Sequence, residues 1–295
     1  MKKKKLTKAV RNRYIFCYVM LLVAIYSVAK YFIINLQSIA MAFQVSEHSG
    51  FSLNNWKLIF SELLDMDSTL WIAIRNTMKY FALGLLKIPL TFIISYFLYK
   101  KIWGYKFFRT VFFMPSMVAP VILILLIKDI IKVGGPVYIL LYRLFGYEMP
   151  NLVSNFSTAT NTILFYTFWC GFGASLLIYV GAMNRIDSEI LDAARIDGCG
   201  SFREFINIIL PMCWETLSTM IMLDIINIFM ASGPILYFTG GDYGTNTLAY
   251  WIFDQVRDGT YYYPSTVGLF FTLLAVPIVI IVNLLMKRGG STVEY

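Results

Sequence analysis

The residues of this sequence that could perform chemistry are few and lie far apart. Four cysteines, at positions 17, 170, 199 and 213, form no CxxC pair, and His48 is the only histidine. Because zinc sites need closely spaced Cys and His ligands, we expect neither a metal site nor a disulfide framework. The phosphate-binding pattern G-x-x-x-x-G-K-[ST] is also absent. These observations argue against an enzyme and against a bound cofactor.

Polar side chains inside apolar stretches are the second group of interest. Asp224 and Asn227 lie in one such stretch and Lys87 in another. A carboxylate at membrane depth costs about 2.5–3.5 kcal/mol on insertion scales, so Asp224 should face a cavity or a partner. On a helix, Asp224, Asn227 and Ile228 share one face. That face either lines a path for a polar solute or holds helices together through an Asp224–Lys87 pair.

A polar stretch between two of the apolar segments predicts two short helices joined by a tight turn. Asp187 or Ser188 can cap the first helix. Gly198-Cys199-Gly200 interrupts the helical pattern and permits the turn. Ser201 can cap the second helix, with Glu204 three residues later as its capping-box partner.

Small residues in this stretch leave room for another surface. Ala193, Ala194 and Gly198 would let a second protein approach the backbone closely. The same pattern suits a helical hairpin that merely packs under a membrane. Physical reasoning from these residues leaves both interpretations open.

The composition requires an apolar solvent around the chain. Of 295 residues, 58% are hydrophobic and 14% charged, against about 45–50% and about 25% in soluble domains. A bilayer core about 30 Å thick is crossed by about 20 apolar residues in a helix, whose backbone groups are satisfied internally. The sequence therefore predicts an all-α membrane protein with about six transmembrane helices, near residues 14–36, 70–99, 107–131, 161–183, 212–238 and 264–286.

Basic residues in the connections predict the orientation, because cytoplasmic loops are enriched in Lys and Arg. With both termini inside, 16 basic residues lie in cytoplasmic segments and 4 in outer ones. The inner segments are 1–13, 100–109, 184–210 and 287–295, and the outer ones are 37–69, 132–160 and 237–263. This N-in, C-in topology explains the net charge of +8 without a nucleic-acid partner.

The polar stretch resembles a known family motif. Asp192-Ala193-Ala194, Asp197-Gly198, Phe205 and Ile208 to Pro211 are similar to the EAA loop of binding-protein-dependent ABC importer permeases, E-A-A-x-x-D-G-A followed by I-x-L-P. Asp192 stands where the family has Glu, and Cys199 where it has Ala. Residues 108–115 and 169–179 resemble the third and fourth helices of carbohydrate permeases, on the side of the first permease of a maltose- or glycerol-phosphate-type pair.

The resemblance implies a domain organisation and two sets of functional residues. A basic cytoplasmic arm (1–13) precedes the first transmembrane helix and outer loop (14–69), a permease core (70–286, with the EAA loop at 188–211) and a cytoplasmic tail (287–295). The residues expected to couple to an ATPase are Asp192, Ala193, Ala194, Asp197, Gly198 and Cys199. Those expected to line the substrate path are Cys170, Gly171, Ala174, Asp224, Asn227 and Ile228.

The resemblance also implies partners and a place in the cell. The chain would be a non-catalytic permease subunit in a bacterial plasma membrane, forming half of the path for a sugar or oligosaccharide. Its partners would be a second permease subunit, expected to be a different chain, two ATPase subunits and an extracytoplasmic solute-binding protein.

Two other classes remain as alternatives. A stand-alone secondary carrier would show an inverted repeat and helices broken at matched positions, and neither is apparent in the sequence. A signalling subunit would also explain a docking loop, but it would not accumulate a substrate.

Overall fold

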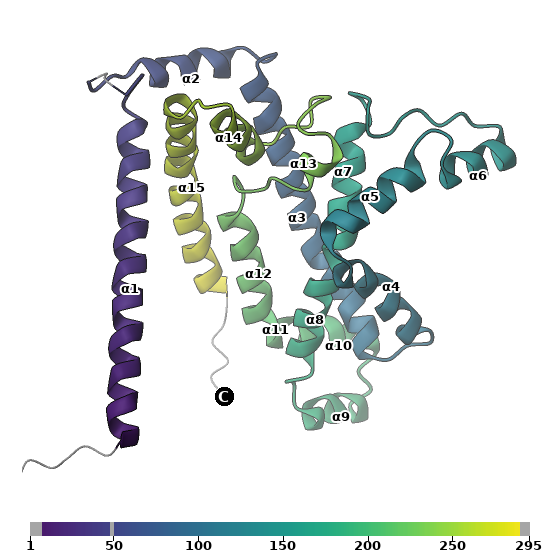
Figure 1. Cartoon of the computed structure of the whole chain (residues 1–295). Coiled ribbons are helices and arrows are strands. Elements are labelled where there is room, and N and C mark those ends of the chain that lie inside the picture. Colours follow the sequence, from purple (N-terminus) through teal and green to yellow (C-terminus); the bar gives the residue numbers. More distant parts are fainter. Residues whose placement is uncertain (1–7, 48–49, 290–295) are drawn as a thin grey trace, which may run out of the picture.

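The computed structural model describes residues 8–47 and 50–289, with the side chains of 13–47 and 50–286. Every regular element in this part of the chain is helical, which confirms the all-α prediction (Figure 1). Residues 1–7 of the predicted basic arm, His48, and residues 290–295 of the predicted tail lie outside the described residues.

Four helices of the described chain are long and apolar enough to cross a membrane, and two bent pairs raise the number to six. This range agrees with the predicted count. The continuous spans lie in α1 (Lys8–Met41), α3 (Thr69–Tyr99), α7–α8 (Ala159–Cys170 and Phe172–Met183) and α15 (Tyr262–Gly289).

The first bent pair corrects the prediction of one helix over residues 107–131. α4 (Tyr105–Met117) and α5 (Pro120–Ile131) are separated by Val118 and Ala119, and the chain turns by 109° there. A residue before proline is pushed out of the helical region, and Ala119 has an extended ψ of 128°. α6 (Pro136–Phe145) continues the second arm of the bend.

The second bent pair corrects the prediction of a helix over residues 212–238. α10 (Ser201–Glu204), a π-helical turn (Phe205–Ile209) and α11 (Leu210–Met212) meet α12 (Trp214–Ile226) at 68°. α12 ends where Asn227 turns its amide back onto the carbonyl of Leu223, at 2.7 Å. α13 (Ile235–Phe238) is a separate short helix.

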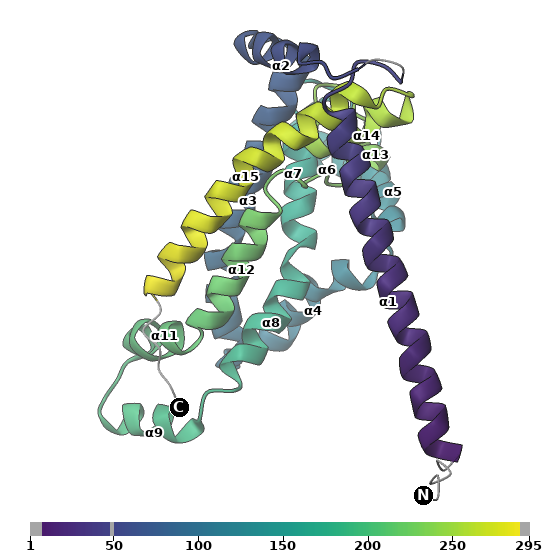
Figure 2. The ribbon, with the colours of Figure 1, turned by 90° about the vertical axis from the view of Figure 1, so that its left-hand side faces the viewer.

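The two ends of the bundle carry different elements. α2 (Asn54–Leu64) and α14 (Leu248–Arg257) lie at one end, and α9 (Ser188–Ile196) lies at the other (Figure 1). α1 begins and α15 ends toward the α9 end (Figure 2). The described ends of the chain are thus on the same side as α9, in agreement with the predicted topology, whose direction across the membrane stays a prediction.

Apolar clusters hold the bundle together. One cluster joins α3 and α8 to the segment that runs from α9 to α12, through Phe92, Tyr179, Leu191 and Ile209. Two further clusters lie toward the α2–α14 end. There the amide of Asn76 in α3 also donates to the carbonyl of Gly244 at 2.8 Å. α3 is therefore the helix that packs at both ends of the molecule.

Candidate coupling loop and substrate pathway

The predicted first helix of the polar stretch is α9. The Asp187 carboxylate accepts a hydrogen bond from the backbone N–H of Glu189 at 3.1 Å, which confirms the predicted cap. Gly198 has a φ of +74°, a conformation that a side chain disfavours, so the turn falls where it was predicted. The N–H of Cys199 then closes the helix on the carbonyl of Ala194 at 2.9 Å.

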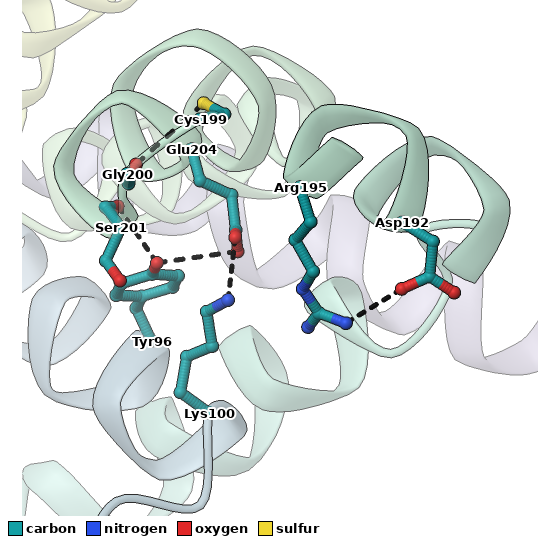
Figure 3. A network of polar contacts seen from close by, with 8 residues as sticks. All are labelled: Tyr96, Lys100, Asp192, Arg195, Cys199, Gly200, Ser201 and Glu204. Carbon is teal, nitrogen blue, oxygen red and sulfur yellow. Dashed lines mark hydrogen bonds and ion pairs between the residues drawn. The ribbon is translucent and has the colours of Figure 1, made fainter. Parts of the chain in front are cut away.

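The predicted capping box of the second helix is wrong. Gly200 occupies the N-cap of α10, and no side chain caps that helix. Glu204 is instead 2% exposed and forms an ion pair with Lys100 at 2.7 Å, measured from Nζ to Oε2 (Figure 3). The hydroxyl of Tyr96 donates to the carbonyl of Ser201 at 3.0 Å and lies 3.4 Å from Glu204 Oε1.

We call these four residues, Tyr96, Lys100, Ser201 and Glu204, the Lys100–Glu204 network. Sequence reasoning missed it because Lys100 and Glu204 are 104 positions apart. Lys100 is the C-cap residue that directly follows α3, where a positive charge also suits the helix dipole. The network therefore fastens the start of α10 to the end of α3.

The predicted coupling residues form one largely exposed surface. Asp192, Ala193, Asp197 and Gly198 are exposed, and Ala194 and Cys199 are half-buried. Beside them, Ile196 and Phe202 are 87% and 77% exposed. The backbone beneath this surface is anchored by Leu191 and Ile209 in the apolar cluster. An exposed surface with large apolar side chains on a fixed support can bind another protein.

Two of the predicted pathway residues, Gly171 and Asp224, lie close to α3. A methyl group at Gly171, between α7 and α8, would lie 2.8 Å from Nζ of Lys87. A methyl group at Gly84 would clash with Oδ1 of Asp224 in α12. Because neither glycine has a side chain, Lys87 lies directly against the backbone of Gly171, and Asp224 lies directly against the backbone of Gly84.

The two charges in this region are near each other but do not form an ion pair among the described residues. Lys87 and Asp224 interact electrostatically, and Asp224 also acts on the hydroxyl of Tyr179. In the described part of the chain, Oδ2 of Asp224 and the Tyr179 hydroxyl are buried without a hydrogen-bond partner. Asp224 and Lys87 are therefore not in contact as an ion pair in this structure, and the role of Asp224 in the pathway stays a prediction.

The remaining predicted pathway residues are scattered. Cys170 ends α7 and is half-buried, and Ala174 is exposed on α8. Asn227 and Ile228 follow the last residue of α12, so they do not continue the helical face of Asp224 as predicted. Asn227 is exposed and Ile228 is 7% exposed.

Comparisons with known proteins agree with this architecture. The profile of the family described as "Binding-protein-dependent transport system inner membrane component" matches residues 87–289, more than half of the chain. The polygalacturonan/rhamnogalacturonan transport system permease protein YteP of Bacillus subtilis is 25% identical over 76% of this chain and 72% of its own length. The sn-glycerol-3-phosphate transport system permease protein UgpA of Escherichia coli O157:H7 is 26% identical over 69% of this chain and 68% of its own.

A solved structure has the same fold. A chain of a bacterial ABC transporter involved in the import of the acidic polysaccharide alginate superposes with a TM-score of 0.79, covering 94% of this chain and 96% of that one at 20% identity. The family profile spans both the loop between α8 and α12 and the helices that carry Lys87, Gly171 and Asp224. This chain belongs to the binding-protein-dependent transport system inner membrane components, the permease subunits of ABC importers.

Proposed function

We propose that this chain forms half of the translocation pathway of an ATP-driven importer for a sugar or oligosaccharide. The observation that carries the coupling part is the surface around Gly198, which is exposed, partly apolar and rigidly supported. ATP hydrolysis takes place on two separate ATPase subunits, one of which binds this surface. A second permease chain completes the pathway, and a solute-binding protein delivers the substrate outside the bacterial plasma membrane.

The substrate class rests on the relatives and on the polar groups inside the bundle. Relatives are named as transport system permeases for polygalacturonan or rhamnogalacturonan, for multiple sugars and for sn-glycerol-3-phosphate. Asp224, Tyr179 and Lys87 offer acceptors and donors that bind hydroxyl groups. A buried polar group without a partner is costly, and a sugar hydroxyl that reaches it lowers that cost. Family membership supports the importer and does not support the stand-alone carrier.

The proposed binding of the ATPase to this surface is tested with a large side chain at position 198. The variant Gly198→Trp and the matched control Gly198→Ala both place a side chain on a backbone with a φ of +74°. They share this strain of about 1–2 kcal/mol and differ in volume. No atom lies within 4 Å of a methyl group at this position, so the indole projects outward rather than into the chain's own packing.

The measurement is co-purification with the candidate ATPase subunit in detergent. We expect the wild type and Gly198→Ala to retain the ATPase and Gly198→Trp to lose it while the chain stays folded in the membrane. Equal retention by all three variants would contradict the assignment of this surface, and no association with the wild type would contradict the importer itself.

A further inference from the structure

The ion pair of the Lys100–Glu204 network is more buried than an ordinary surface ion pair. Glu204 is 2% exposed and Lys100 is 21% exposed, whereas the Asp192–Arg195 pair on α9 is more than half exposed on both sides. An exposed pair contributes little to stability and tolerates movement. A buried carboxylate must keep its cation close, because separation leaves a charge without solvent or partner. The network therefore fixes a distance between two elements.

Those two elements are the loop that follows α9 and the end of α3. The apolar cluster also holds them together, but apolar contacts are not directional and allow sliding. The bonds of the network are directional: Lys100 to Glu204 at 2.7 Å and Tyr96 to the carbonyl of Ser201 at 3.0 Å. A displacement of α10 therefore has to be followed by the end of α3.

The covalent route from the loop to α12 is less rigid. It passes through the π-helical turn Phe205–Ile209 and a 68° bend at Cys213. π-Helical turns are short irregularities in which the regular ladder is interrupted. α3, in contrast, stays one helix from Thr69 to Tyr99, although Pro89 lies inside it and removes one backbone hydrogen bond. It carries Gly84 and Lys87 against Asp224 and Gly171, about 18 Å from the network at a rise of 1.5 Å per residue.

We propose that Lys100 and Glu204 are positioning residues that make α3 the lever of the importer. The network transmits a displacement of the coupling loop along α3 to the region of Lys87 and Asp224. This inference rests on the proposed function, because it takes the loop to be moved by the ATPase. It adds which helix carries the movement and which contacts attach it.

The test follows α3 with spin labels in the assembled complex. Leu86→Cys in α3 and Leu223→Cys in α12 carry the labels, since both side chains are exposed at the bundle surface. The four native cysteines are first replaced by alanine. The probe is ATP trapped with vanadate, so that no sugar is needed, and the readout is the change of the label distance on trapping.

Three variants separate transmission from simple folding. Lys100→Met combined with Glu204→Leu removes both charges without leaving one buried alone. Lys100→Arg keeps the pair. Lys132→Gln breaks an exposed pair with Asp129 in the connection after α5 and serves as the matched control.

We expect trapping to shift the distance in the wild type, in Lys100→Arg and in Lys132→Gln. In the double variant the shift is lost while ATPase binding and ATP hydrolysis persist. An unchanged shift in the double variant would overturn the inference, and so would loss of the ATPase, since the network would then only stabilise the loop. An absent shift in the wild type, with ATP hydrolysed, would instead overturn the proposed coupling.

Discussion

Two lysine–acid combinations join α3 to the segment that runs from the loop into α12, and they differ in one respect. Lys100 and Glu204, at the end of α3, form an ion pair at 2.7 Å. Lys87, in the middle of α3, and Asp224, two residues before the end of α12, interact electrostatically without forming one among the described residues. The first combination uses its charges to fix two elements together. The second leaves Oδ2 of Asp224 buried without a hydrogen-bond partner in the described part of the chain.

The largest effect expected from this comparison follows removal of Lys100. Lys100→Met leaves the carboxylate of Glu204 at 2% exposure without its cation. Breaking a buried pair in this way costs about 3–5 kcal/mol. Glu204→Gln should cost less, because Lys100 is 21% exposed and its ammonium can turn to water. Denaturant unfolding in detergent measures the stability of both variants. Equal losses of unfolding free energy would contradict the idea that the more buried partner, Glu204, depends more on the pair.

A smaller loss of stability is expected when the close contact between α3 and α12 is overpacked. The methyl group in Gly84→Ala would clash with Asp224 Oδ1, so the carboxylate or the helix must move. Overpacking of this kind costs about 1–3 kcal/mol, partly offset by about 1 kcal/mol of helix propensity. Adding Asp224→Ala should relieve the clash and restore stability but not transport. If Gly84→Ala transports normally, the position of the carboxylate does not matter for the pathway.

Loss of the hydroxyl in Tyr96→Phe should lower the free energy of unfolding less than Lys100→Met does. It removes the 3.0 Å bond to the Ser201 carbonyl but leaves the Lys100–Glu204 ion pair in place. A single hydrogen bond of this type contributes about 1 kcal/mol. The same unfolding measurement applies, and a loss as large as that of Lys100→Met would mean that the hydroxyl, not the ion pair, holds the network.

The smallest effect is expected on the exposed face of the same loop. Arg195→Gln breaks the ion pair with Asp192 at 2.7 Å, in which both side chains are more than half exposed. Such i,i+3 pairs contribute about 0.3–0.5 kcal/mol, so unfolding should hardly change. A cost above that of Tyr96→Phe would contradict the contrast between buried and exposed charges in this loop.

Local features of the chain could be predicted from neighbouring residues. The Asp187 cap and the Gly198 turn are both present, because each is decided by bonds and φ angles within a few positions. The two breaks at Pro120 and Cys213 were missed, although Pro120 carries a local signal for the first. An apolar run predicts that a segment lies in lipid, but it does not predict whether the helix in that segment is straight.

The sequence by itself determined the membrane setting, the number of spans to within the bent pairs, and the motif of the loop. Only the tertiary structure decided that Glu204 binds Lys100 rather than capping its own helix, and that Gly84 lies against Asp224. Glu204 had two possible partners, a nearby backbone N–H and a distant ammonium. The packing of α10 against α3 buried the carboxylate beside Lys100, and a buried carboxylate is stabilised most by a full opposite charge.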